Sequence, residues 1–150
     1  MVRRANPEDA PVLARMLHDF NLEFGDPSPG TEVLEPRIRR FIEEETKEFF
    51  LAGEDPIGFA QMDFIPTIWA EGPVGHLDEL YVRPDRRGQG TGRELMEAIL
   101  ADARSRGASG MEVVTGEDDT AARGLYESTG FVNEIEGPDN TRSLFYELEF

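Results

Sequence analysis

The sequence contains no cysteine. This absence excludes disulfides, cysteine-ligated metals and a cysteine nucleophile. Basic residues are also scarce, since Lys+Arg 15 against Asp+Glu 31 gives a formal net charge of −16 and a pI of about 4.4. Such a charge argues against general binding to nucleic acid or to anionic membranes, and it is compatible with a cationic substrate such as an amine.

Long hydrophobic runs are absent as well. No apolar segment is long enough to span a bilayer, and no signal-like segment opens the chain. A cytoplasmic location is therefore expected. The 150 residues, 39% hydrophobic and 31% charged, suit one domain over residues 1–150 with a core of its own. No motif indicates a metal site.

The most informative stretch is residues 77–106. Aliphatic and aromatic residues at 77–82 predict a strand, which Pro84 ends because it lacks a backbone N–H. A glycine-rich turn follows at 86–92. The helix after it carries one apolar face, formed by Leu95, Met96, Ile99, Leu100 and Ala103.

This turn has the character of a phosphate site. Gly88, Gly90 and Gly92 permit unusual φ angles and a close approach of backbone to ligand. The N–H groups at the start of the helix lack intrahelical acceptors and lie at the positive end of its dipole. Positive charge is added by Arg86, Arg87 and Arg93. In a chain this acidic, a polyanionic ligand would explain the cluster.

Two standard phosphate motifs fit poorly. A P-loop needs a Lys after its last glycine, and none is present. A Rossmann fingerprint needs G-x-G-x-x-G and an acid after the next strand, whereas that strand, 111–114, is followed by Thr115-Gly116. Residues 87–92 instead read R-x-x-G-x-G, and residues 122–131 read A-x-x-L-Y-E-x-x-G-F. Both segments closely resemble the GNAT superfamily of N-acetyltransferases.

The resemblance implies a mixed α/β (α+β) acyltransferase fold. This fold has a mostly antiparallel, twisted sheet with a splayed parallel strand pair, flanked by about four helices. Turn and periodicity signals predict strands at 1–4, 49–52, 57–65, 77–82 and 111–114, helices at 6–25, 33–45, 93–106 and 119–130, and a C-terminal hairpin of 131–136 and 143–150. The strands at 77–82 and 111–114 should be parallel, because a helix joins them by a right-handed crossover.

The cofactor that the resemblance implies is acetyl-CoA. Its pantetheine arm would pair with the backbone beside Leu80 and Val82, and its pyrophosphate would lie on the glycine turn. The implied contacts are Leu80, Tyr81, Val82, Arg87, Gly88, Gln89, Gly90, Thr91, Gly92, Arg93, Asp119 and Arg123. Two positions depart from the family pattern: many members carry Asn where this chain has Asp119, and an aliphatic residue where it has Thr91. The role of Asp119 is therefore open.

Acetyl transfer to an amine needs a neutral amine and a protonated leaving thiolate. By the resemblance, Tyr126 is the general acid to the departing CoA thiolate. Strand alternation places Glu79 and Tyr81 on one face and Asp78, Leu80 and Val82 on the other. Glu79 is our preferred base, through water, with Asp78 as the alternative. The absence of cysteine excludes a route through an acyl-cysteine. We expect direct attack in a ternary complex, with proximity as its main term.

The acceptor amine is not specified by the sequence. It could be a small amine, an aminoglycoside-like compound, an amino acid derivative or a peptide amine. Candidate acceptor residues are Phe24, Asp78, Glu79 and Trp69. A non-catalytic acyl-CoA sensor of the same fold, or more remotely a nucleotide-binding regulatory domain, is the alternative to an enzyme. A homodimer is left open.

Overall fold

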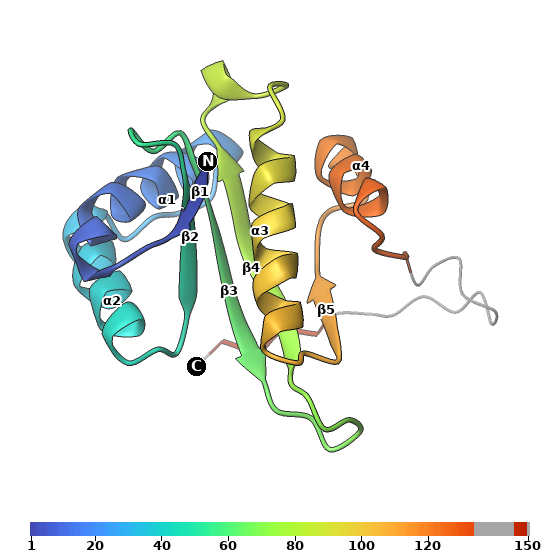
Figure 1. The fold of residues 1–150 in the computed structure, drawn as a ribbon. Helices are drawn as coiled ribbons and strands as arrows, with labels where there is room; N and C mark the ends of the chain where they lie inside the picture. The colour runs from blue at the N-terminus through green and yellow to red at the C-terminus, as the bar shows by residue number, and fades with distance from the viewer. Residues whose placement is uncertain (134–145, 150) are drawn as a thin grey trace. The chain divides into compact units, whose positions relative to one another are not determined.

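The computed structural model of the chain describes residues 1–133 and 146–149 (Figure 1). It divides into two compact units, residues 1–114 and residues 115–150. Most of the C-terminal hairpin predicted over 131–136 and 143–150 lies outside the described residues. Among the helices that are described, none has the length and apolar character needed to cross a membrane.

The first unit is a sheet with helices on both faces. Its elements in chain order are β1 (Val2–Arg4), the 3-10 helix η1 (Pro7–Asp9), α1 (Ala10–Phe24), α2 (Thr31–Glu43), β2 (Glu48–Ala52), β3 (Gly58–Ile65), β4 (Val74–Val82), the 3-10 helix η2 (Pro84–Arg86), α3 (Thr91–Ser105) and β5 (Gly110–Val113). The described strands form one sheet of order β1-β2-β3-β4-β5. Neighbours are antiparallel except β4 and β5, which are parallel. The predicted mixed sheet with its parallel pair is confirmed.

Local signals explain where the first helices begin and end. Asn6 accepts a hydrogen bond from the Glu8 N–H, and the Asp9 carboxylate accepts one from the Asn6 N–H, which together form a capping box. The first turn is 3-10 rather than α, so α1 begins at Ala10. Gly25 ends α1 in the left-handed conformation, with φ 76°.

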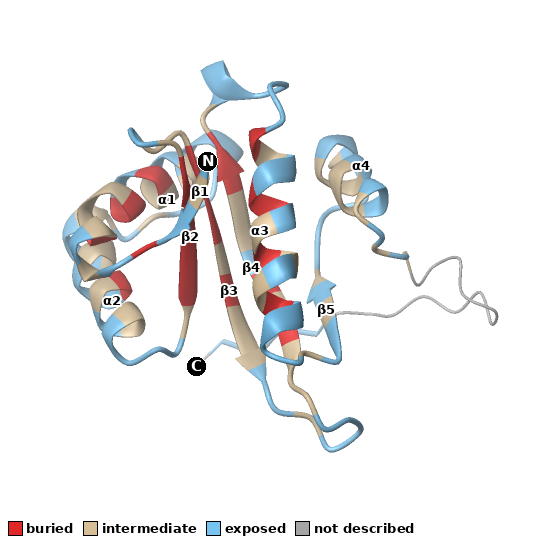
Figure 2. Ribbon diagram, in the orientation of Figure 1, coloured by how far each residue is buried: buried red, intermediate tan, exposed pale blue. Residues whose placement is uncertain are grey.

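The two faces of the sheet have separate apolar layers. Helices α1 and α2 pack Leu13, Met16 and Ile38 against strand residues that include Phe59 and Tyr81. On the other face, α3 turns its fully buried side chains Leu95, Met96 and Ile99 to the sheet. Figure 2 shows buried segments in red along β2, β3 and β4 and on one side of α3.

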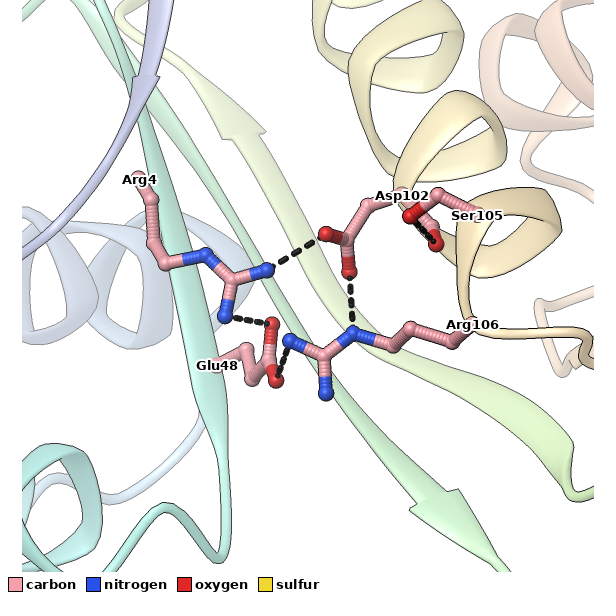
Figure 3. A network of polar contacts seen from close by, with 5 residues as sticks. All are labelled: Arg4, Glu48, Asp102, Ser105 and Arg106. Carbon is pink, nitrogen blue, oxygen red and sulfur yellow. Dashed lines mark hydrogen bonds and ion pairs between the residues drawn. The ribbon is translucent and has the colours of Figure 1, made fainter.

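A polar network anchors the C-terminal half of α3 to the first two strands (Figure 3). The Glu48 carboxylate is buried and pairs with Arg4 at 2.7 Å and also with Arg106. Asp102 pairs with Arg106 at 2.9 Å and with Arg4, so the four groups close a ring. Burial raises the pKa of Glu48, and the two arginines oppose that rise. The network fixes α3, and with it the helix N-terminus that follows the glycine turn.

The second unit contains α4 (Thr120–Ser128). Asp119 caps it, because its Oδ1 accepts a hydrogen bond from the Ala122 N–H at 2.9 Å. Gly130 follows in the left-handed region, with φ 101°. The helix predicted over 119–130 is confirmed.

Candidate active site

The edge of β4 that faces β5 is open over its last residues. The parallel pairing between the two strands ends at Leu77 and Val113, whereas β4 runs on to Val82. Beyond Leu77, no strand of residues 1–133 or 146–149 pairs with this edge. Strands that separate in this way leave backbone donors and acceptors for an extended ligand.

The register identifies which backbone groups face the open edge. The Arg83 N–H donates to the Ile57 carbonyl on the β3 side at 2.9 Å. By alternation, the backbone groups of Leu80 and Val82 point to the opposite, open side, while those of Tyr81 point to β3. The Tyr81 ring is buried and packs against Phe20 and Phe59, with centroids 5.3 and 6.1 Å away. The Leu80 backbone and the Val82 N–H are thus the groups available to a ligand strand, while the Val82 carbonyl already accepts a hydrogen bond from the Arg87 side chain.

The glycine turn forms a cradle of backbone N–H groups. Gly88 and Gly90 have φ angles of 73° and 88°, and a Cβ at either position would meet nothing within 4 Å. Glycine is therefore required by the backbone conformation and not by packing inside the chain. Among the described residues, the N–H groups of Gly88, Gln89, Gly90, Thr91 and Gly92 have no hydrogen-bond acceptor, and α3 has no side-chain N-cap. These features fit a pyrophosphate.

The Arg87 side chain contacts β4 and the end of α1. Its Nε donates to the Val82 carbonyl at 2.9 Å. Its two terminal nitrogens donate to the Glu23 carboxylate at 2.6 and 2.8 Å. The guanidinium also lies over the Tyr81 ring, 5.7 Å from its centroid. The contact with Glu23 joins the turn to the last turn of α1.

A β-bulge in β4 changes the arrangement of its carboxylates. Gln61 pairs with Glu79 and Met62 with Leu77, so Asp78 is an extra residue in the strand. The alternation that placed Asp78 on the opposite face from Glu79 is therefore wrong, because a bulge interrupts the two-residue period. The Asp78 carboxylate accepts a hydrogen bond at 3.1 Å from Gln61, the residue that lies opposite Glu79.

Lys47 lies between two carboxylates beside Glu79. Its ammonium donates to Asp63 at 2.7 Å and to Asp78 at 2.5 Å. Burial alone would lower the pKa of Lys47, but the two carboxylates raise it overall. Sequence reasoning missed this residue. The signal was present in the β2–β3 hairpin, where Glu48 pairs with Met62 and the preceding Lys47 is therefore aligned with Asp63.

Glu79 has the most strongly perturbed carboxyl group in the first unit. It is half-buried, and burial together with the charges of Asp78 and Asp26 raises its pKa to about 7, while Lys47 opposes the rise. Asp78 is tied into an ion pair and a hydrogen bond, whereas no hydrogen bond is found for Glu79 among the described side chains. A carboxylate with a pKa near neutrality can exchange a proton at neutral pH.

The proposed acceptor residues do not all lie together. Asp78 and Glu79 adjoin in β4, and Phe24 is exposed at the end of α1 with its ring 5.2 Å from Phe20. Trp69 is 87% exposed in the loop that leads into β4 at Val74. That loop and the glycine turn lie at opposite ends of the strand (Figure 1), so the structure does not bring Trp69 to Glu79.

Arg93 lies in the first turn of α3, in the first unit. Three predicted residues, Asp119, Arg123 and Tyr126, belong to the second unit. Asp119 acts there as the cap of α4, a role that Asn can also fill. Arg123 donates to the Glu117 carbonyl at 3.0 Å and lies 3.8 Å from the Glu127 carboxylate. The Tyr126 ring packs 5.9 Å from Phe131. The roles of these three residues at the acyl donor stay predictions.

Comparison with known proteins gives a consistent result. The sequence model of the acetyltransferase (GNAT) family matches residues 13–131. A crystal structure from Arthrobacter sp. FB24, assigned as an acetyltransferase, is 46% identical, covers 100% of this chain and 96% of its own, and superposes with a TM-score of 0.89. Thialysine N-epsilon-acetyltransferase from Caenorhabditis elegans is 28% identical over 85% of this chain and 79% of its own length. Aminoglycoside N(6')-acetyltransferase type 1 from Stenotrophomonas maltophilia is 27% identical over 87% and 84%.

The fold, the open strand edge and the glycine turn therefore define an acetyltransferase. The chain belongs to the GNAT family of N-acetyltransferases, enzymes that use acetyl-CoA as co-substrate. The predicted family and fold are confirmed.

Proposed function

We propose that this enzyme transfers the acetyl group of acetyl-CoA directly to a primary amine of a small molecule or peptide. The observation that carries the proposal is Glu79, a half-buried carboxylate with its pKa raised to about 7, in the strand whose open edge is suited to the donor. It supports a base that is ionised in a useful fraction at neutral pH.

The donor would be held mainly by backbone. The N–H groups of residues 88–92 would bind the pyrophosphate, and the open edge at Leu80 and Val82 would pair with the pantetheine arm. Arg93, Asp119 and Arg123 are further proposed contacts. When bound, acetyl-CoA supplies a thioester whose carbonyl the amine attacks. The chain contributes orientation, which is the main term in a direct transfer between two bound molecules.

Glu79 would remove the proton from the incoming ammonium, directly or through one water. The amine must be neutral to attack, and a group with a pKa of about 7 can accept its proton while staying mostly ionised above neutrality. The negative charges of Asp78 and Asp26, which raise the pKa of Glu79, would also attract a cationic amine. Asp78 is the weaker base candidate because Lys47 and Gln61 hold its carboxylate.

Tyr126 would donate the proton that the leaving thiolate needs. A tyrosine has one O–H donor and an ordinary pKa of about 10, so it stays protonated at neutral pH. Its position in the A-x-x-L-Y-E-x-x-G-F motif supports this role.

The relatives support an amine as the acceptor and do not favour one amine over another. One relative is named for thialysine and another for the 6' amino group of aminoglycosides. Both compounds are amines, which agrees with the acidic surroundings of Glu79 and with the net charge of −16. An amino acid derivative or a peptide amine would also present an ammonium group.

The test is a steady-state pattern together with the identity of the product. Initial rates are measured while acetyl-CoA and the best amine are varied, and the product is examined by mass spectrometry. Direct transfer predicts intersecting double-reciprocal lines and acetylation on nitrogen. Parallel lines, or an acetylated enzyme formed without acceptor, would contradict direct transfer.

A further inference from the structure

We propose that Glu23 is a positioning residue which, through Arg87, holds the glycine turn in the conformation that binds acetyl-CoA. The inference rests on the proposed function, and it assigns the Arg87 side chain to anchoring the turn and not to the phosphates. It rests on contacts within the first unit.

The contact pattern of Arg87 directs its side chain toward α1. The two terminal nitrogens grip the Glu23 carboxylate in a bidentate pair, the Nε holds the Val82 carbonyl, and the guanidinium plane lies near Tyr81. Tyr81 belongs to the apolar layer under α1 and α2. The guanidinium thus joins β4 and α1, while the N–H cradle belongs to the turn that opens α3.

The turn needs such an anchor because its own sequence does not fix it. Residues 84–90 are all exposed, and Gly88 and Gly90 make no close packing contact through the Cβ direction. Glycine-rich segments lose the most conformational freedom when they become ordered. A contact that orders the turn before binding removes part of that cost from the binding step.

The contact between Glu23 and Arg87 also involves the segment at the end of α1 that lies near Glu79. Glu23 lies in the last turn of α1, and the Asp26 N–H just after that helix donates to the Asn21 carbonyl at 2.8 Å. Asp26 is one of the charges that raise the pKa of Glu79. The pair of Glu23 and Arg87 therefore links the donor turn to a segment that contributes, after burial and Asp78, to the raised pKa of Glu79.

The geometry of the Arg87 contacts distinguishes anchoring of the turn from simple electrostatic attraction of a phosphate. An Arg fork can bind a carboxylate with two nitrogens and still donate its Nε to a carbonyl, whereas a Lys ammonium is a point charge. If Arg87 acted by attracting phosphate, Lys would preserve much of its effect. If it anchors the turn, Lys would not. Both side chains are partly exposed, so the expected change in affinity is about fivefold.

The experiment measures acetyl-CoA affinity by calorimetry for the wild type and for Glu23→Gln, Arg87→Lys, Arg87→Gln and the double variant Glu23→Gln/Arg87→Gln. Asp19→Asn is the matched control, since Asp19 is exposed one turn earlier on α1 and loses the same charge. The KM for acetyl-CoA and kcat are measured alongside, well below each variant's melting temperature.

Positioning predicts that Glu23→Gln raises the Kd and KM for acetyl-CoA about fivefold with a smaller change in kcat, while Asp19→Asn leaves both unchanged. Arg87→Lys should resemble Glu23→Gln, and Glu23→Gln should add nothing in the Arg87→Gln background. Equal affinity in Glu23→Gln and Asp19→Asn, or tighter binding in Glu23→Gln, would overturn the inference. A wild type that does not bind acetyl-CoA would instead refute the proposed function on which it rests.

Discussion

Replacing Glu79 with Gln should stabilise the protein at alkaline pH while it abolishes most of the activity. In the wild type, ionising Glu79 is opposed by burial and by the charges of Asp78 and Asp26. The amide keeps the shape of the protonated acid and never ionises. A group that is needed for chemistry but costs stability is expected at an active site.

The size and the sign of the stability difference between Glu79→Gln and the wild type follow from the pKa of Glu79. A folded-state pKa of about 7 against an ordinary value of 4.5 corresponds to about 3 kcal/mol. Because Glu79 is only half-buried, solvent screening reduces this to about 1–2 kcal/mol. The folded state holds the proton more tightly, so wild-type stability falls as pH rises from about 4.5 to about 7 and is level above that. The advantage of the variant is thus full at pH 8 and roughly half of that at pH 5.

The assay is urea unfolding of both proteins at pH 5 and pH 8, with Glu54→Gln as the control. Glu54 is an exposed acid in the turn between β2 and β3, so its loss reports the general effect of removing one charge from a chain of net charge −16. At pH 8 we expect Glu79→Gln to gain more stability than the control variant does. At pH 5 this difference should be smaller. A difference that does not depend on pH, or a variant less stable at pH 8, would show that ionised Glu79 does not cost stability in the folded protein.

Three further variants test the general acid, the glycine turn and the effect of Lys47 on Glu79. Tyr126→Phe should lower kcat about a hundredfold and leave the Kd for acetyl-CoA nearly unchanged, because it removes only the donor hydroxyl; unchanged kcat would remove Tyr126 from the chemistry. Gly90→Glu should abolish thermal stabilisation by acetyl-CoA, since it adds a like charge and a side chain at φ 88°, whereas Gly107→Glu, at φ 69° beyond the far end of α3, should not. Retained stabilisation in Gly90→Glu would mean that the turn is misassigned. Lys47→Met should raise the pKa of Glu79 further, because it removes a positive charge that lowers that pKa. The acid limb of the pH profile of kcat/KM should then move to higher pH. An unmoved limb would show that the group titrating there is not Glu79.

Local signals made most of the fold predictable. Alternation and turn residues indicated the β2–β3 hairpin, and the order strand, glycine turn, helix and strand required β4 and β5 to be parallel. The start of β4 was predicted at Leu77 and is found at Val74. Pairing decides that boundary, because residues from Val74 on are held between β3 and β5.

The candidate site was predictable only where its chemistry is local in sequence. The glycine turn and Glu79 could be read directly. The bulge at Asp78 could not, since it depends on how β4 pairs with Gln61 and Met62. The contact between Glu23 and Arg87 joins residues 64 positions apart, and a charged residue at the end of a helix gives no sign of such a partner.

Acetyl transfer to an amine with Glu79 as base is tested most directly by the release of free CoA thiol from acetyl-CoA across a panel of amines and basic peptides. The protein contains no cysteine, so a thiol-reactive dye gives no background from the enzyme. We expect release that depends on one class of amine and is lost in Glu79→Gln. No release with any amine, together with no stabilisation by acetyl-CoA, would contradict this expectation; stabilisation without release would favour a protein that only binds acyl-CoA.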